Sequence, residues 1–189
     1  MYKIGITGTI GAGKTTIATL FAKFNIPIFD ADIEIKEILT RKEIKNKIKK
    51  IWPSAFKDQE INKNKLKSII FSNTNEKKKL EELLYPYLNI EKDKFEKKNK
   101  NKKILVYDVP LIYETKSEKE YNIILLACCD ESTQKKRVLA RDKISESLFE
   151  NITKSQLSFD EKKRFNPKII DTNNFKLFIL IKVLLLIIK

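Results

Sequence analysis

The sequence predicts an α/β protein in which a five-stranded parallel sheet is flanked by helices. Three observations predict this class: short apolar runs alternate with helical segments, the clearest runs are apolar at nearly every position, and a glycine-rich stretch joins the first run to the first helix. Continuous apolar runs are typical of parallel strands covered on both faces, and the alternation with helices indicates right-handed crossovers. A chain of 189 residues suits one domain.

The expected strands are separated by helical segments. They span residues 2–7, 26–30, 104–108, 122–127 and 168–171. The first helix should bury one face at the spacing i, i+3, i+4, i+7, formed by Ile17, Leu20, Phe21 and Phe24. The other expected helical segments are 33–40 with Ile35, Ile38 and Leu39 inward, pieces between 41 and 75, 76–98 disturbed at Pro86, a long stretch from 134 to about 164, and a terminal helix within 175–189.

The stretch Gly8-Thr9-Ile10-Gly11-Ala12-Gly13-Lys14-Thr15 fits the phosphate-loop pattern G-x-x-x-x-G-K-[ST] at every fixed position. A strand before it and a helix after it supply the required context, in which loop N–H groups and the helix dipole attract an anion. We expect Lys14 to reach the β- and γ-phosphates of ATP and the Thr15 hydroxyl to bind Mg²⁺. The expected ATP-binding residues are Gly8, Gly11, Ala12, Gly13, Lys14, Thr15 and Thr16. The motif predicts a phosphate-loop NTPase fold, and the alternative is a chance glycine turn.

Glycine is scarce, and its positions narrow the function. The chain has four glycines, Gly5, Gly8, Gly11 and Gly13, all within this first stretch. GTPases need an Asp-x-x-Gly switch and transport ATPases need a glycine-rich signature, and neither pattern is present. A small-molecule kinase remains, because its acceptor site can be built from carboxylates, arginines and helices.

Composition excludes further classes. The chain has no His, which excludes His general bases, Ser-His-Asp triads and His-ligated zinc. The adjacent Cys128 and Cys129 are expected to be reduced, buried thiols. The net charge of +14 comes almost entirely from scattered Lys, which favours a solvated surface over specific nucleic-acid binding. A basic, nucleic-acid-associated ATP-binding protein is the alternative from another class.

The two ends of the chain bear on its location. The first strand begins at residue 2, so we expect no signal peptide and a cytoplasmic location. The apolar run 175–189 is interrupted by Lys176 and Lys182 and is shorter than the ~20 residues that a spanning helix needs. We therefore expect a helix packed on the domain and no membrane span, with peripheral membrane contact as the minor alternative.

Two of the four arginines are candidates for phosphate binding. Arg137 and Arg141 are spaced i, i+4, so both guanidinium groups can point at one object, and Arg binds phosphate in a bidentate way that Lys does not reproduce. Arg164 is a weaker third candidate. The alternative is surface pairing with Asp130, Glu131 or Asp142.

Further motifs carry a resemblance to a known family. After the glycine loop, a strand ends in Asp30-Ala31-Asp32, and Asp108-Val-Pro110-Leu111-Ile-Tyr-Glu114 fits an Asp-x-Pro-Leu-x-x-Glu pattern. Gln134, Arg137 and Arg141 fit Gln-x-x-Arg-x-x-x-Arg, and Gln156 follows. In this order, over about residues 3–173, the chain resembles the dephospho-coenzyme A kinases. It departs from them at Tyr85-Pro86, where the family commonly has His-Pro.

The resemblance implies a substrate, a cofactor and an organisation. ATP and dephospho-coenzyme A would be the substrates and Mg²⁺ the cofactor, and another nucleoside or nucleotide kinase of this fold is the nearest alternative. We expect a single domain, 1–189, with its core in 1–34 and 103–189, a helical insertion over about 35–100 that covers the substrate, and a helical lid over about 135–165. The oligomeric state stays open.

The resemblance also implies roles for individual residues. Asp32 becomes the expected catalytic carboxylate, together with Lys14, Arg137 and Arg141; its position alone fits a helix N-cap equally well. Asp30, Asp108 and Glu114 are the expected acceptor contacts. Asp30 fits capping equally well, and Glu114 fits a surface helix equally well. Asp108 ends a strand where phosphate-loop enzymes keep a carboxylate near Mg²⁺, so it is also an expected metal ligand beside Thr15.

Overall fold

The computed structural model describes residues 1–142, 144–173 and 176–188. The chain divides into two compact units, one formed by Met1–Ala31 with Phe95–Lys189 and the other by Asp32–Lys94. The second unit falls on the stretch for which the sequence predicts a helical insertion over 35–100. That this insertion covers a substrate stays a prediction.

The first unit is built on a parallel sheet of five strands. In spatial order they are β2 (Ile28–Asp30), β5 (Ile104–Asp108), β1 (Tyr2–Thr7), β6 (Ile123–Cys128) and β7 (Lys168–Asp171). Every neighbouring pair is parallel, which confirms the predicted fold class and each predicted strand to within two residues. Because β1 is central and all strands run the same way, the loop that follows it lies at the edge where the carboxyl ends of all five strands meet.

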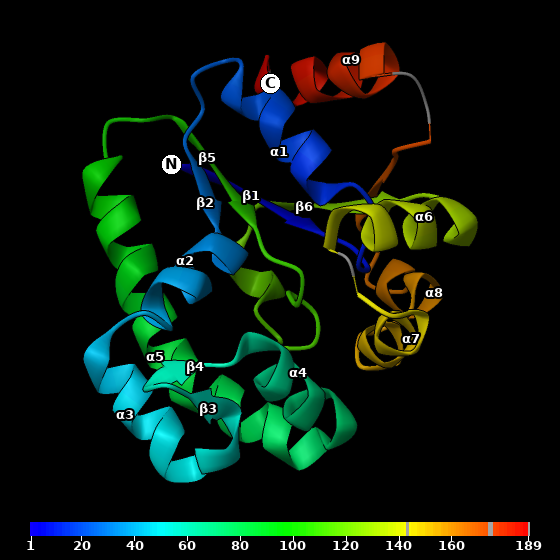
Figure 1. The fold of residues 1–189 in the computed structure, drawn as a ribbon. Helices are drawn as coiled ribbons and strands as arrows, with labels where there is room; N and C mark the ends of the chain where they lie inside the picture. Colours follow the sequence, from blue (N-terminus) through cyan, green and yellow to red (C-terminus); the bar gives the residue numbers. More distant parts are fainter. Residues whose placement is uncertain (143, 174–175, 189) are drawn as a thin grey trace. The chain divides into compact units, whose positions relative to one another are not determined.

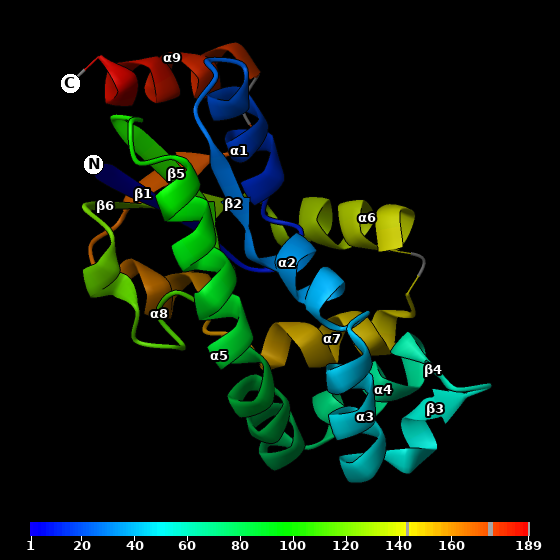
Figure 2. The same ribbon diagram turned by 90° about the vertical axis from the view of Figure 1, so that its left-hand side faces the viewer.

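Helices cover both faces of this sheet. In Figures 1 and 2, α1 (Lys14–Ala22) and α9 (Lys176–Ile187) lie side by side on one face, while α8 (Phe159–Lys163) lies on the other. Ile17, Leu20 and Phe21 are buried as predicted, but Phe24 lies beyond the end of α1 and is 40% exposed. The helix ends early because Asn25 takes a left-handed conformation, with a φ of 56°.

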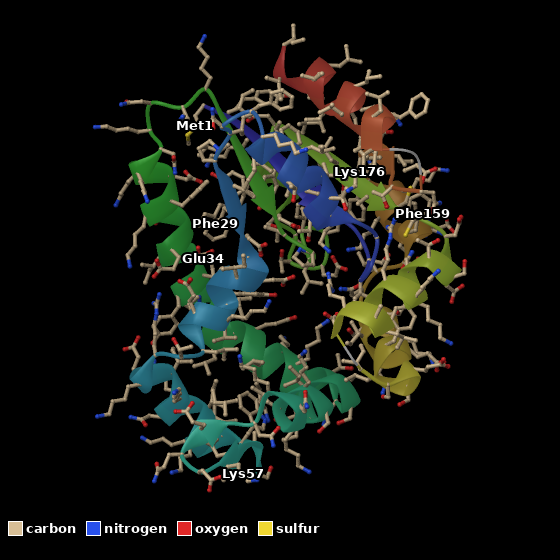
Figure 3. All side chains as sticks on the ribbon, turned by 45° about the horizontal axis from the view of Figure 1, so that its top comes forward. Met1, Phe29, Glu34, Lys57, Phe159 and Lys176 are labelled. Carbon is tan, nitrogen blue, oxygen red and sulfur yellow. The ribbon has the colours of Figure 1, made fainter. Side chains whose placement is uncertain are left out.

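At the outer edge of the sheet, aromatic rings join β2 to β5. The ring of Phe29, labelled in Figure 3, has its centroid 5.5 Å from that of Phe95 and 5.9 Å from that of Tyr107. The Tyr107 hydroxyl donates to Glu96 at 2.8 Å. These contacts hold the short strand that ends at Asp30.

The terminal helix is packed on the first unit. Ile179 and Val183 of α9 are buried in the core that α1 shares with the sheet. An opposite set of apolar side chains is exposed, made up of Leu177, Phe178, Ile181, Leu185 and Ile188. No helix in the described part of the chain is long and apolar enough to cross a membrane.

The long helical stretch predicted from 134 to 164 is wrong as a single element. It consists of three helices: α6 (Glu131–Asp142), α7 (Glu146–Lys154) and α8. The Ser145 hydroxyl accepts from the Leu148 N–H, and Ser158 forms a capping box with Glu161, so each new helix starts at a serine cap.

The second unit is helical with one small hairpin. The chain enters it through α2 (Ala31–Ile38) and continues through α3 (Lys42–Ile51), a short 3₁₀ turn (Pro53–Ala55), β3 (Phe56–Lys57), β4 (Glu60–Ile61), α4 (Lys63–Ser72) and α5 (Thr74–Lys98). Its core gathers around the buried Trp52, whose indole N–H donates to Glu76. Pro86 lies within α5, which continues through it.

Candidate active site

The phosphate loop is shaped by close backbone contacts that leave no room for side chains. Gly13 has a φ of 92°, and a Cβ built on it would lie 2.6 Å from Thr172 Oγ1. A Cβ on Gly8 would lie 2.6 Å from the carbonyl oxygen of Ala127 on β6. The loop is closed by Ala12 N–H donating to Thr9 O at 3.1 Å. Ala127 on β6 and Thr172 just after β7 thus fix the path of the loop at its two ends.

Lys14 and Thr15, which are expected to bind phosphate and metal, are the first two residues of α1. Lys14 is half-buried, and its ammonium lies 3.4 Å from Gly8 O, across the loop. Thr15 is exposed, and the first turn of α1 contains no acidic residue. Because Gly13 has no side chain to cap the helix, the positive end of its dipole faces the loop, an arrangement that favours an anion.

Arg137 contacts the phosphate loop through Thr172. Its Nη1 donates to Thr172 Oγ1 at 2.9 Å and its Nη2 to Thr172 O at 3.0 Å. The Thr172 hydroxyl in turn donates to Ala12 O at 2.8 Å. Neither contact is the surface pairing with an acidic residue that is the alternative for Arg137. In this structure Arg137 supports the loop, and its contact with a phosphate stays a prediction.

Arg141 is bonded to its neighbour in the sequence, Asp142. Its guanidinium forms two 2.8 Å hydrogen bonds with Asp142 and its side chain is 63% exposed. This is the surface pairing that the sequence leaves open as its alternative. The structure therefore does not bring Arg137 and Arg141 onto one object.

Residues at the start of α6 and just after β6 also contact the phosphate loop. Gln134 accepts from the Thr9 hydroxyl and donates to Cys129 O, both at 3.1 Å. The Cys129 thiol lies 3.6 Å from Gly11 O. Burial is the main cause that raises the pKa of both Cys128 and Cys129, so both are protonated thiols at neutral pH. Both are free, as the sequence predicts, but the prediction that they are buried is wrong, because both are half-buried.

Two carboxylates lie side by side at the ends of neighbouring strands. Asp30 on β2 is in register with Asp108 on β5, and Ile6 of β1 flanks Asp108 on its other side. Asp108 is only 5% exposed, whereas Asp30 is half-buried. Adjacent strands are about 4.8 Å apart, so both carboxylates stand at the sheet edge from which the phosphate loop also leaves.

Asp32 does not occupy a helix N-cap. The helix α2 begins at Ala31, directly after β2 ends, so Asp32 is the second helical residue and lies exposed in the first turn. The capping alternative for Asp32 is therefore wrong, and its position favours the helix dipole instead. Its catalytic role stays a prediction.

Glu114 is bonded to the protein through both carboxylate oxygens. Oε1 accepts from the Leu157 N–H at 2.9 Å and from Lys162 Nζ at 2.8 Å, and Oε2 lies 3.2 Å from the same ammonium. It is not a surface helix residue, since its side chain is 15% exposed. A contact between Glu114 and an acceptor stays a prediction.

Sequence reasoning missed the supporting residues Lys162 and Thr172. Lys162 is one of many lysines, and nothing in the pattern separates it from the solvated ones, although it is fully buried. Thr172 carries no motif and could be found only from its contact with Gly13. Gln134 and Gln156 did carry a signal, their place in the family pattern, but that pattern assigned them no role.

A metal ion would find a limited set of protein ligands here. No group of three or more His, Cys, Asp or Glu side chains among the described residues could hold a metal ion. Mg²⁺ with a nucleotide usually takes one or two protein oxygens, phosphate oxygens and waters. The Thr15 hydroxyl and the Asp108 carboxylate have the oxygen chemistry for that arrangement.

A central strand that leads through a glycine loop into a helix, with carboxylates at the ends of the next strands, defines a phosphate-loop protein. A crystal structure of a Thermus thermophilus protein has the same fold, with a TM-score of 0.83 at 24% identity, covering 99% of this chain and 96% of that one. The chain belongs to the dephospho-CoA kinase family, whose model matches residues 2–177.

Relatives of known name agree with this assignment. A dephospho-CoA kinase of Fusobacterium nucleatum is 34% identical over 90% of this chain and 89% of the relative. One of Prochlorococcus marinus is 36% identical over 92% of this chain and 89% of the relative. The similarity thus extends over nearly the whole length on both sides.

Proposed function

We propose that this protein transfers the γ-phosphoryl group of ATP to the 3′-hydroxyl of the ribose of dephospho-coenzyme A, giving coenzyme A and ADP in the cytoplasm. The family match over residues 2–177, which includes a complete phosphate loop, carries the proposal. The protein is a transferase that completes coenzyme A synthesis.

At phosphorus the reaction forms one bond and breaks one, and a proton is transferred beside it. The 3′-oxygen attacks the γ-phosphorus, the bond from that phosphorus to the β–γ bridging oxygen breaks, and ADP leaves. The hydroxyl proton passes to the Asp32 carboxylate, which also orients the hydroxyl. Phosphoryl transfer depends mainly on positioning and charge neutralisation, so the protein has little covalent work to do.

The phosphate loop supplies most of this neutralisation. The loop N–H groups from Gly11 to Thr15, other than that of Ala12, which donates to Thr9 O, hold the β- and γ-phosphates, and Lys14 moves from Gly8 O to the transferred group. The Thr15 hydroxyl and the Asp108 carboxylate would hold Mg²⁺, which would supply positive charge to the phosphates when bound. Asp30, beside Asp108, contacts the acceptor. Arg137 approaches the phosphates from α6, and Arg141 joins it by leaving the Asp142 carboxylate to which it is bonded in this structure.

The proposal is tested by following ADP release against a panel of acceptors. Dephospho-coenzyme A should give Mg²⁺-dependent turnover well above that with deoxynucleosides, nucleoside monophosphates, shikimate or water. Stoichiometric coenzyme A, identified by mass spectrometry, should accompany the ADP. Equal or faster turnover with a nucleoside or nucleotide would replace the proposal with the nearest alternative, a kinase of the same fold with another acceptor.

A further inference from the structure

One short segment, 156–162, touches both loops of the site. It connects α7 to α8 and includes the first turn of α8. At its start the Gln156 side-chain oxygen accepts from the backbone N–H of Ile10, inside the phosphate loop, at 2.9 Å. The next residue, Leu157, donates its N–H to Glu114, on the loop after β5, at 2.9 Å. Two consecutive residues therefore hold two loops that are far apart in sequence.

The far end of the segment is fixed by a buried ion pair. Lys162 is 0% exposed, and its ammonium donates to Glu114 and, at 2.9 Å, to Pro110 O. Pro110 O also accepts from the Thr7 hydroxyl of β1 at 2.8 Å, just ahead of the phosphate loop. A buried ammonium is costly unless all its hydrogen bonds are made, so this end of the segment has little freedom to move.

These side-chain hydrogen bonds, together with the short stretches of chain that connect them, form a closed ring. It runs from Thr7 to Pro110, through Lys162 and Glu114 to Leu157, and back through Gln156 to Ile10. Ile10 immediately precedes Gly11, where the phosphate-facing part of the loop begins. The Gln156 side-chain oxygen, held rigidly as the hydrogen-bond acceptor of the Ile10 N–H, thus sets the direction of the N–H groups that follow Ile10 in the loop.

We propose that the segment 156–162 is a strut that positions the phosphate loop, and that Gln156 is its positioning residue. The proposal rests on ATP being the ligand of the loop, as in the proposed function. Gln156 suits the place because its amide accepts a hydrogen bond without adding negative charge near the phosphates. Glu114 and Lys162 act through it by holding the strut in place.

The first test replaces Gln156 with Met, which keeps the length and removes the acceptor. Gln156→Met should raise the Kd for ATP roughly three- to tenfold, the range for one hydrogen bond. The KM for dephospho-coenzyme A and the melting temperature should stay near wild type. Gln59→Met makes the same change at an exposed hairpin turn and should alter none of the three quantities.

Unchanged ATP affinity in Gln156→Met, or an equal loss of ATP and dephospho-coenzyme A affinity with lower melting, would overturn the proposal. The two proposals fail separately. Titration with a fluorescent ATP analogue measures ATP affinity, and so it tests the strut even if dephospho-coenzyme A is not phosphorylated. Absent turnover with intact ATP binding would overturn only the proposed function.

A second test separates holding the strut from overall stability. Lys162→Met leaves the Glu114 charge buried without its partner and should lower the melting temperature by roughly 10 °C and weaken ATP binding. The double variant Glu114→Gln/Lys162→Met removes both charges and keeps an acceptor for the Leu157 N–H. It should recover most of the melting temperature together with the ATP affinity. Recovered melting without recovered affinity would contradict the strut.

Discussion

Lys14→Ala is expected to abolish turnover, lowering it by at least ~10³-fold, the scale of losing a cation that stabilises the transferred phosphoryl group. Lys14 stands at the first position of α1, half-buried, and its ammonium lies 3.4 Å from Gly8 O. Alanine is the best helix former and removes no core contact, so the melting temperature should change by less than about 2 °C.

The measurement is ADP release in the presence of dephospho-coenzyme A, beside circular dichroism melting. Lys23→Ala is the matched control, because Lys23 is an exposed lysine at the other end of the same helix. It should retain full activity. A parallel loss of structure and activity in Lys14→Ala would contradict a purely functional role for this lysine.

Asp32→Asn is expected to lower the turnover number by roughly 10²–10⁴-fold, the usual range for losing a general base. The substitution keeps the shape of the side chain and removes its ability to take the proton of the acceptor hydroxyl. ATP affinity should stay near wild type, because the phosphate loop holds the nucleotide. Turnover, ATP affinity and melting are measured on the same preparation.

The control for Asp32 comes from the same helix turn. Asp32 and Glu34 both lie in the first turn of α2, where each carboxylate is stabilised by the helix dipole. Asp32→Asn and Glu34→Gln should therefore lower the free energy of unfolding by similar amounts, ~0.3–1 kcal/mol each. Only Asp32→Asn should lose turnover. Near-normal turnover in Asp32→Asn would remove this carboxylate from the reaction.

The strands were predictable because burial on both faces leaves a continuous apolar run, which few other structures produce. The hairpin of β3 and β4 was missed for the opposite reason, since two-residue strands carry no period. Its turn uses Asp58 and Gln59, both with positive φ, where a chain richer in glycine would show a recognisable signal. The serines that divide 134–164, Ser145 and Ser158, are recognisable in the sequence as candidate N-caps. The prediction failed because the helical pattern on either side of them favoured one continuous helix.

The site was predictable where chemistry demands a fixed spacing, as in the phosphate loop. It was not predictable where a residue acts through packing across the sheet. Thr172 fills the space beside Gly13, and Lys162 is buried among groups that are distant in sequence. The partner choice of Arg141, which bonds to its neighbour Asp142, likewise depends on side-chain geometry rather than on spacing.

The positions of the few glycines in this chain show where the structure requires a residue without a side chain. Soluble proteins carry about 7% glycine, and this chain retains only four in 189 residues. At each of these four a Cβ would come within 2.8 Å of another atom, and the first atoms met are Ile112 Cδ1, Ala127 O, Gln134 O and Thr172 Oγ1. Elsewhere, Asn25, Asp58 and Asn166 carry positive φ without glycine. Positive φ alone is thus not reserved for glycine in this protein. Glycine stands where a Cβ would clash, and at Gly8, Gly11 and Gly13 it also has a positive φ.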